Sequence, residues 1–170
     1  MRKITILMLL VAFAVAAYPL NGDCAETVHL YLKANGQDIK GNSTQVKGAI
    51  PCVSFTGGGS GIGMATGQRQ YAPIVIHKRV DQSSPLIQKA LTQNQHIEAQ
   101  FKFFRANPDG STTEVNTVTI KDARITSVKR LGPTASGQFA PLEEVTFVYQ
   151  TISVPHEVGH VTSSDKWTAQ

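Results

Sequence analysis

The feature that most restricts the fold of this chain is an alternation of apolar and polar residues with a period of two. In VHLYLK (28–33) every second residue is apolar, and the turn dipeptide Asn35-Gly36 follows. HIEAQFKFFRA (96–106) repeats the alternation and ends at the turn NPDG (107–110). A period of two places successive side chains on opposite faces of a strand, and such turn residues reverse the chain. The pattern therefore predicts antiparallel β-strands joined by hairpins.

Two shorter stretches add strands with particular constraints. AIPCVSF (49–55) alternates, but Pro51 has no N–H to donate, which predicts a position at a sheet edge or a bulge. APIVIHK (72–78) contains the continuous apolar run Ile74 to Ile76, which predicts a strand buried on both faces.

Two longer stretches complete the β content. TEVNTVTIKDARITSVKR (113–130) predicts the partner of the preceding hairpin strand and a second strand, with a bulge or bend near Asp122 and Ala123, where the period changes. LEEVTFVYQTISV (142–154) predicts one long strand that is apolar on both faces. We expect the core to cover one face and a partner the other.

A single helix is predicted at residues 84–93. Ser84 is placed as its cap and Pro85 at its first position, and the apolar residues of this stretch recur at helical spacing. Strands at short spacing with one helix predict a mainly β fold, in which two antiparallel sheets form a β-barrel with one short flanking α-helix.

The N-terminus has the pattern of a secretory signal peptide. Arg2 and Lys3 precede an apolar run from Ile4 to Ala17, which is too short for a typical membrane-spanning helix. We predict a signal peptide at residues 1–25, cleaved after Ala16 or Ala25, and a single domain at 26–170. The protein is therefore expected to be exported, to the periplasm or the outside of the cell, without stable membrane insertion.

Charge and cysteine content exclude some classes of protein. The formal net charge is only +4, and no Lys/Arg cluster is interleaved with aromatic residues, so nucleic-acid binding is not expected. Cys24 and Cys52 pair only if cleavage occurs at the earlier site, and the favoured interpretation is a lone buried thiol at Cys52. The glycine-rich stretch 57–67 lacks the spacing of a phosphate-binding loop, so a flexible loop is predicted there.

The stretch VPHEVGHVT (154–162) contains an H-E-x-x-H motif at His156, Glu157 and His160. In zinc proteases this motif lies on a helix, which brings both histidines to the metal. Here it follows β-branched residues and Pro155 and contains Gly159, which predicts the end of a strand. The extended form of the motif would also need a glycine and a histidine at positions occupied by Ser163 and Lys166. A zinc metalloprotease is therefore a remote alternative, although adventitious metal binding by the two histidines stays open.

No other set of residues predicts catalysis. His29, His77 and His96 are interpreted as half-exposed strand histidines, and Glu143 and Glu144 as neighbours on opposite faces of one strand. We predict no catalytic, cofactor-binding or metal-binding residues and no enzyme activity.

Several segments, in order, resemble the haemolysin-coregulated protein (Hcp) family of type VI secretion systems. The resemblance covers nearly all of 28–167, and RQYAPIVIHKRVDQSSPLIQKAL (69–91) is its most specific part. The matching positions are Pro73, Lys78, Asp81, Ser84, Pro85, Leu86, Leu142, Glu143, Val145, Phe147, Tyr149, Ile152, Asp165 and Trp167.

The resemblance implies a non-enzymatic barrel that assembles into hexameric rings, which stack into a tube and carry small effectors. Two features differ from the family. A signal peptide would send the chain to the periplasm first, whereas the tube proteins assemble in the cytoplasm, and the glycine-rich insert lies in the loop expected to contact the next ring. We expect an exported, self-assembling tube-like component, carrier or effector, with secretion-machinery components or small effectors as partners. The alternative is a periplasmic or secreted monomeric β-barrel binding module.

Overall fold

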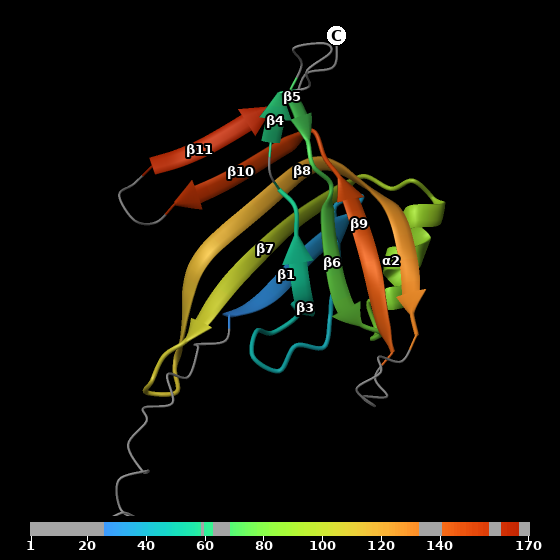
Figure 1. Cartoon of the computed structure of the whole chain (residues 1–170). Coiled ribbons are helices and arrows are strands. Elements are labelled where there is room, and N and C mark those ends of the chain that lie inside the picture. Colours follow the sequence, from blue (N-terminus) through green and yellow to red (C-terminus); the bar gives the residue numbers. More distant parts are fainter. Residues whose placement is uncertain (1–25, 59, 63–68, 133–140, 157–160, 167–170) are drawn as a thin grey trace, which may run out of the picture.

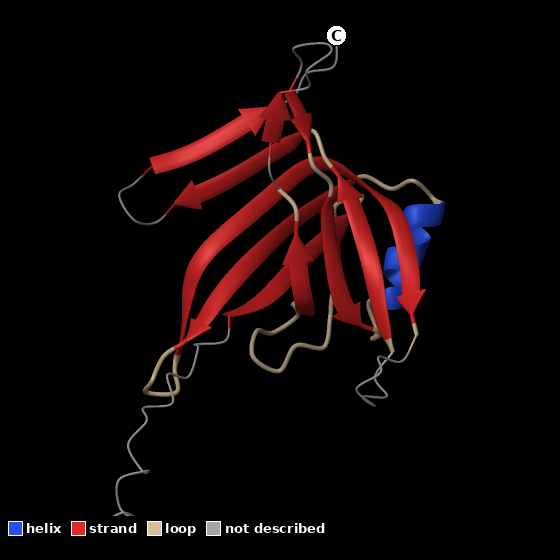
Figure 2. Cartoon of the chain, viewed as in Figure 1, coloured by secondary structure: helices blue, strands red, loops and turns tan. Residues whose placement is uncertain are grey.

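Six strands of the computed structural model form a closed antiparallel barrel (Figures 1 and 2). The structure describes residues 26–58, 60–62, 69–132, 141–156 and 161–166. In order around the barrel the strands are β8 (Thr112–Leu131), β7 (Ile97–Ala106), β1 (Glu26–Ala34), β3 (Ile50–Thr56), β6 (Ile74–Arg79) and β9 (Leu142–Val148). Pairing between β8 and β9 closes the ring of strands. The predicted mainly β barrel is thus confirmed, while the predicted signal peptide and Cys24 lie outside the described residues.

The long strand β8 makes closure possible because it bends in its middle. Its first part pairs with β7 as far as Ala123, and its second part pairs with β9 from Arg124 onward. At the change of partner Asp122 has a φ of 52°, and the buried side chains switch from even to odd positions, Ile120 before the bend and Ile125 after it. The bend lies where the change of period predicts it, but the stretch forms one strand, and the prediction of two was wrong.

The remaining elements lie outside the barrel wall. These are β2 (Gln37–Ile39), β4 (Ser60–Ile62), β5 (Arg69–Tyr71), α2 (Ser84–Thr92), β10 (Thr151–His156) and β11 (Val161–Lys166). The helix α2 packs against β8, and it begins and ends within a residue of the predicted bounds. The β10–β11 hairpin and the short β4–β5 ribbon both extend beyond one end of the barrel (Figure 1). In the described part of the chain no helix is long and apolar enough to cross a membrane.

The core fills the inside of the barrel with the inward residues of all six strands. Its large members include Leu30, Ile50, Ile76, Phe101, Ile120 and Phe147, each 0% exposed. Phe101 makes edge-to-face contacts with Phe147 and Phe55, at centroid distances of 5.9 Å and 5.0 Å. Such rings contribute large buried apolar areas, which is why the alternation of the sequence is decisive for this fold.

The predicted single strand at 142–154 is two strands. The chain turns after Val148, and β10 pairs with β8 through Thr151 to Ser153. Ile152 is therefore 7% exposed and packs within its own chain. The prediction of a two-faced strand required Ile152 to face a partner, and this was wrong. Val148, which was predicted to lie on the same face, is 40% exposed.

Other local expectations change for similar reasons. The strand that contains Pro51, β3, is not at a sheet edge, because it lies between β1 and β6. The register of the β3–β6 pair shifts between Cys52 and Ser54, which is next to the proline and not at it. Pro51 itself is paired with β1 alone, because the β6 pairing begins at Cys52. The prediction that β6 is buried on both faces was wrong, since Val75 is only half-buried.

Part of the glycine-rich stretch is also ordered into strands rather than a loop. Its residues 60–62 form β4 and pair with β5, while residues 59 and 63–67 lie outside the described part. Gly57 begins this departure from the barrel with a φ of 109°, and a Cβ there would approach the Pro73 carbonyl oxygen to 2.1 Å. Glycine is therefore required at this position.

Candidate functional site

A buried ionic cluster connects the barrel to the helix. Alternation along β6 points Lys78 inward after Ile74 and Ile76, and the β6–β9 register places Glu143 opposite it. The Lys78 Nζ donates to Glu143 Oε1 at 2.8 Å and to Asp81 Oδ1 at 2.9 Å. The side chains of Lys78, Asp81 and Glu143 are 0%, 2% and 2% exposed. This cluster is closed to solvent, so its charges compensate one another instead of meeting a ligand.

Hydrogen bonds continue from the cluster into α2. The Ser84 hydroxyl donates to Glu143 Oε1 at 2.7 Å and accepts from the Asp81 backbone N–H at 3.1 Å. Ser83, not Ser84, is the residue that precedes the helix, and its side chain makes no capping bond. The predicted cap was therefore wrong by one residue, because the Ser84 hydroxyl is used to join the helix to β9.

Asp81 is held ionised by its surroundings. Burial alone would raise its pKa, but hydrogen bonds from Ser83 and Lys78, together with the Lys78 charge, outweigh burial and lower the pKa below its ordinary value. The Asp81 carboxylate accepts from the backbone N–H of Ser83 at 2.9 Å and from its hydroxyl at 2.5 Å. Lys78, Asp81 and Ser84 belong to the stretch on which the family resemblance rests, and their shared role is to fix the helix to the barrel.

A second polar row crosses the outside of the barrel. Ser54, His77, Glu144 and Lys129 are cross-strand neighbours on β3, β6, β9 and β8. Ser54 Oγ lies 2.8 Å from His77 Nδ1, and His77 Nε2 lies 3.2 Å from Glu144 Oε2. Hydrogen bonds from His77 and Lys129 lower the pKa of Glu144.

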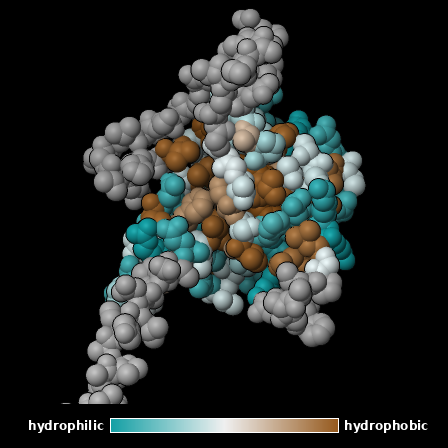
Figure 3. Space-filling view, viewed as in Figure 1, coloured by the Kyte–Doolittle hydropathy of each residue, from teal (hydrophilic) through white to brown (hydrophobic). Residues whose placement is uncertain are grey.

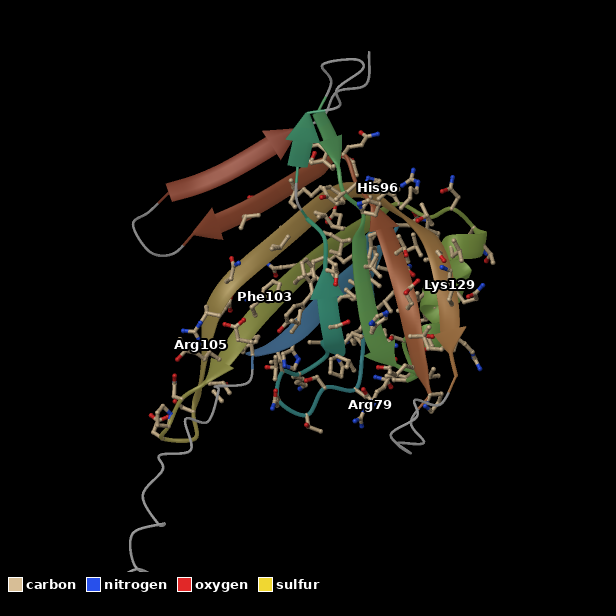
Figure 4. All side chains as sticks on the ribbon, viewed as in Figure 1. Arg79, His96, Phe103, Arg105 and Lys129 are labelled. Carbon is tan, nitrogen blue, oxygen red and sulfur yellow. The ribbon has the colours of Figure 1, made fainter. Side chains whose placement is uncertain are left out.

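This row contains the residue types of a serine hydrolase, but not their arrangement. In a catalytic triad the serine contacts Nε2 and the carboxylate contacts Nδ1, whereas the two nitrogens have the opposite partners here. The carboxylate is also shared with Lys129, whose Nζ is 3.3 Å from Glu144 Oε1 (Figure 4 labels Lys129). The row is best explained as a surface hydrogen-bond ladder. As predicted, Glu143 and Glu144 point to opposite faces.

The predicted half-exposed histidines differ from one another. His77 and His96 are partly exposed, with 36% and 40% of their side chains accessible, and His96 contacts Asp122 Oδ1 at 3.0 Å. His29 is 3% exposed, so the prediction was wrong for this residue. The loop between β2 and β3 covers it, and its ring nitrogens lie 3.1 Å from Gln45 Oε1 and 3.2 Å from Ser43 Oγ.

The H-E-x-x-H motif begins in a strand. His156 is the last residue of β10 and pairs with Val161 of β11, whereas Glu157 and His160 lie outside the described residues. The strand end predicted for this motif is confirmed at His156, and a zincin helix does not begin there. The strand β11, which follows the motif, was not predicted. Within the described residues no three His, Cys, Asp or Glu side chains are grouped so as to hold a metal ion.

Apolar residues gather on two parts of the surface. At the end of the barrel beneath β10, the ring of Phe103 on β7 packs edge-to-face on Phe55, with centroids 5.1 Å apart (Figure 4). On the outer face of β3, β6 and β9, Val53 and Val148 are 60% and 40% exposed. The space-filling view shows apolar residues gathered on the side where these strands lie (Figure 3). We call Val53, Val75 and Val148 the valine face.

Comparison with known proteins gives a consistent result. The chain matches the model of the family described as "Type VI secretion system effector, Hcp" over residues 31–156, well over half of its length. The "Major exported protein" of Pseudomonas aeruginosa is 33% identical over 110 residues. This alignment covers 62% of the present chain and 64% of the relative, so the matched part is less than two thirds of the relative.

Solved structures share the fold. A mutant form of the Hcp1 protein from E. coli EAEC 042 pathovar has 27% identity and a TM-score of 0.73, over 85% of this chain and 100% of that one. The secreted protein Hcp3 from Pseudomonas aeruginosa has a TM-score of 0.67 over 85% of this chain and 100% of its own, and its 22% identity supports the fold alone.

Proposed function

Because the chain belongs to the type VI secretion system Hcp family, we propose that it is an exported, non-enzymatic protein that assembles into rings. It serves as a tube-like structural component, a carrier or an effector of such a system. The observation that carries this proposal is the family match over residues 31–156, which spans the whole closed barrel except the first part of β1. The expected ring is a hexamer, and small effectors or secretion-machinery components are the expected partners.

The β10–β11 hairpin supports self-association. Beyond Ser153, β10 has β11 as its only strand neighbour in the described structure, so the hairpin leaves the barrel (Figure 1). Two-stranded hairpins have little stability on their own in water. Contact with a neighbouring subunit would stabilise this hairpin and shield its open edge, which is an established way of managing exposed strand edges.

The valine face offers a second contact. Val53 and Val148 are among the few large apolar side chains exposed in the described part of the chain, and half-buried Val75 lies on β6 between their strands. The polar row of Ser54, His77 and Glu144 crosses this face between Val53 and Val75, so the face combines apolar and polar groups, as the surfaces of non-obligate protein contacts do. In a ring, one subunit would present this face to the next.

The N-terminal sequence supports the export part of the proposal. We propose that residues 1–25 are a signal peptide and that the mature domain at 26–170 acts in the periplasm or outside the cell. The name of the Pseudomonas relative is consistent with export in the family.

Native mass spectrometry of the full-length gene product, purified after export from a Gram-negative host, tests the proposal. The expected result is a hexamer without stoichiometric metal, whose subunit mass also gives the cleavage site. A monomer would refute ring formation and favour the binding module. One zinc per chain, together with peptide hydrolysis that is lost in Glu157→Gln, would refute the non-enzymatic assignment.

Two matched variants locate the contact. Val148→Glu and Leu86→Glu each introduce a charge at an apolar side chain of similar exposure, 40% and 43%, but only Val148 lies on the valine face. We expect the first variant to dissociate the ring and the second to keep it. A ring that survives Val148→Glu would refute the role of the valine face while leaving the ring proposal intact.

A further inference from the structure

A groove on the outside of the barrel has the properties of a binding site. Its volume is about 490 Å³, within the usual range for ligand sites. It lies over β1, β7 and β8, which run side by side (Figure 1), and the loop after β2 forms one wall. We call it the lysine groove, and the lining residues that matter most are Tyr31, Gln100, Thr119, Lys40, Lys47 and Lys121.

The floor of the groove is a polar row fixed by strand register. Tyr31 pairs with Gln100, and Gln100 pairs with Thr119, so three outward side chains cross β1, β7 and β8 in line. All three are half-buried. The row offers an aromatic surface, an amide and a hydroxyl, which suit the backbone and the apolar parts of a peptide.

The charges of the groove are unequally compensated. Lys33 lies between Asp38 and Glu98, its cross-strand neighbours on β2 and β7, and its Nζ is 3.9 Å from Asp38 Oδ1. Lys40, Lys47 and Lys121 are exposed and make no ion pair within the described residues. Lys40 and Lys47 come from the wall of the groove and Lys121 from β8, so the uncompensated positive charge lies on different sides of the floor.

We propose that the lysine groove binds an acidic peptide segment of a partner protein. A small anion would meet one or two ammonium groups and leave most of the volume empty, whereas an extended segment with several carboxylates reaches all three lysines. Complementary charges of this kind steer association and set specificity. The groove lies within one chain, so this inference does not depend on ring assembly.

Fluorescence anisotropy with a fluorescein-labelled hexaglutamate peptide tests the proposal on the exported protein. We expect saturable binding that weakens as salt is raised, because exposed charge pairs are screened over about 8 Å at physiological ionic strength. The double charge reversal Lys47→Glu/Lys121→Glu should weaken binding by roughly tenfold or more, since it replaces two attractive contacts by repulsive ones. The matched control Lys89→Glu/Arg130→Glu reverses the same amount of charge at two exposed residues outside the groove, on α2 and β8, and should alter binding less than twofold.

Circular dichroism confirms that the variants are folded, and hexaglutamine serves as the neutral peptide. Equal weakening by Lys89→Glu/Arg130→Glu, which changes the net charge by the same amount, would mean that only net charge matters and would overturn the proposal. Unchanged binding in the double variant, or no binding to the parent protein, would also overturn it. Displacement of the peptide by inorganic phosphate at an equal concentration of charge would identify a simple anion site and refute the peptide assignment.

Discussion

Replacing Lys78 by methionine tests the role of the buried ionic cluster most directly. Methionine keeps much of the length and apolar stem of lysine but removes the ammonium group. Among the described residues it would leave the Glu143 carboxylate, 2% exposed, with the Ser84 hydroxyl as its remaining side-chain donor, and it would remove the 2.9 Å contact from Asp81. The carboxylates of Asp81 and Glu143 would then repel each other, because the ammonium group that contacts both of them would be gone.

The expected loss follows from the completeness of this burial. Removing one partner of a buried ion pair typically costs about 3–5 kcal/mol, because the other charge is left without compensation. We expect Lys78→Met to lower the free energy of unfolding by this amount, which corresponds to a fall in Tm of roughly 10 °C for a domain of this size. Lys129→Met, which removes an ammonium 68% exposed beside Glu144, should change stability by no more than about 0.5 kcal/mol.

Urea denaturation followed by far-ultraviolet circular dichroism measures both effects. The double variant Lys78→Met/Glu143→Leu completes a cycle, and it should be less destabilised than the sum of its two single changes because it leaves no unpaired charge at that pair. A loss below about 1 kcal/mol in Lys78→Met, or additivity in the cycle, would contradict the reasoning.

Three further predictions follow from single sites. Gly57→Ala should destabilise the protein by about 1–3 kcal/mol through its positive φ and its clash with the Pro73 carbonyl, whereas Gly132→Ala, with open space around it, should be neutral in the same urea titration. Burial raises the pKa of Cys52 to about 12, so its thiol should react far more slowly with iodoacetamide at pH 8 in the folded than in the unfolded protein, and equal rates would count against this. The pKa of Asp81 is lower in the folded than in the unfolded protein, so its ionised form stabilises the fold above the ordinary carboxylate pKa, and this stabilisation is lost as pH falls through the folded pKa. Asp81→Asn should therefore reduce stability at pH 7 more than at pH 3. An equal reduction at the two pH values would exclude this contribution of Asp81.

The sequence was most informative where one physical signal dominates. Alternation predicted β1 and β7, the change of period predicted the bend at Asp122, and Pro85 predicted the helix to within one residue of its ends. It was least informative where the side chain of a residue in one element bonds to a distant element. Ser84 is suited to capping by type, but its hydroxyl is directed to Glu143 on β9, 59 positions away, which no local pattern records.

The same distinction separates the candidate sites. No local pattern predicts the Ser54–His77–Glu144 row or the lysine groove, because both depend on which strands become neighbours. The family resemblance alone pointed to Lys78, whereas the strand pattern also placed Glu143 on the face opposite to Glu144. The pairing of Lys78 with Glu143 required the β6–β9 register.

By itself the sequence determined a mainly β chain with one helix, since the period of apolar residues fixes which side chains share a face. Only the tertiary structure decided that Ile152 turns into the core, that His29 is covered by a loop, and that a lysine is buried among carboxylates. These outcomes depend on contacts between segments that are far apart in the sequence, such as β6 with β9 and β10 with β8, and the free energy of such contacts is shared by the whole packed interior and not carried by any local stretch.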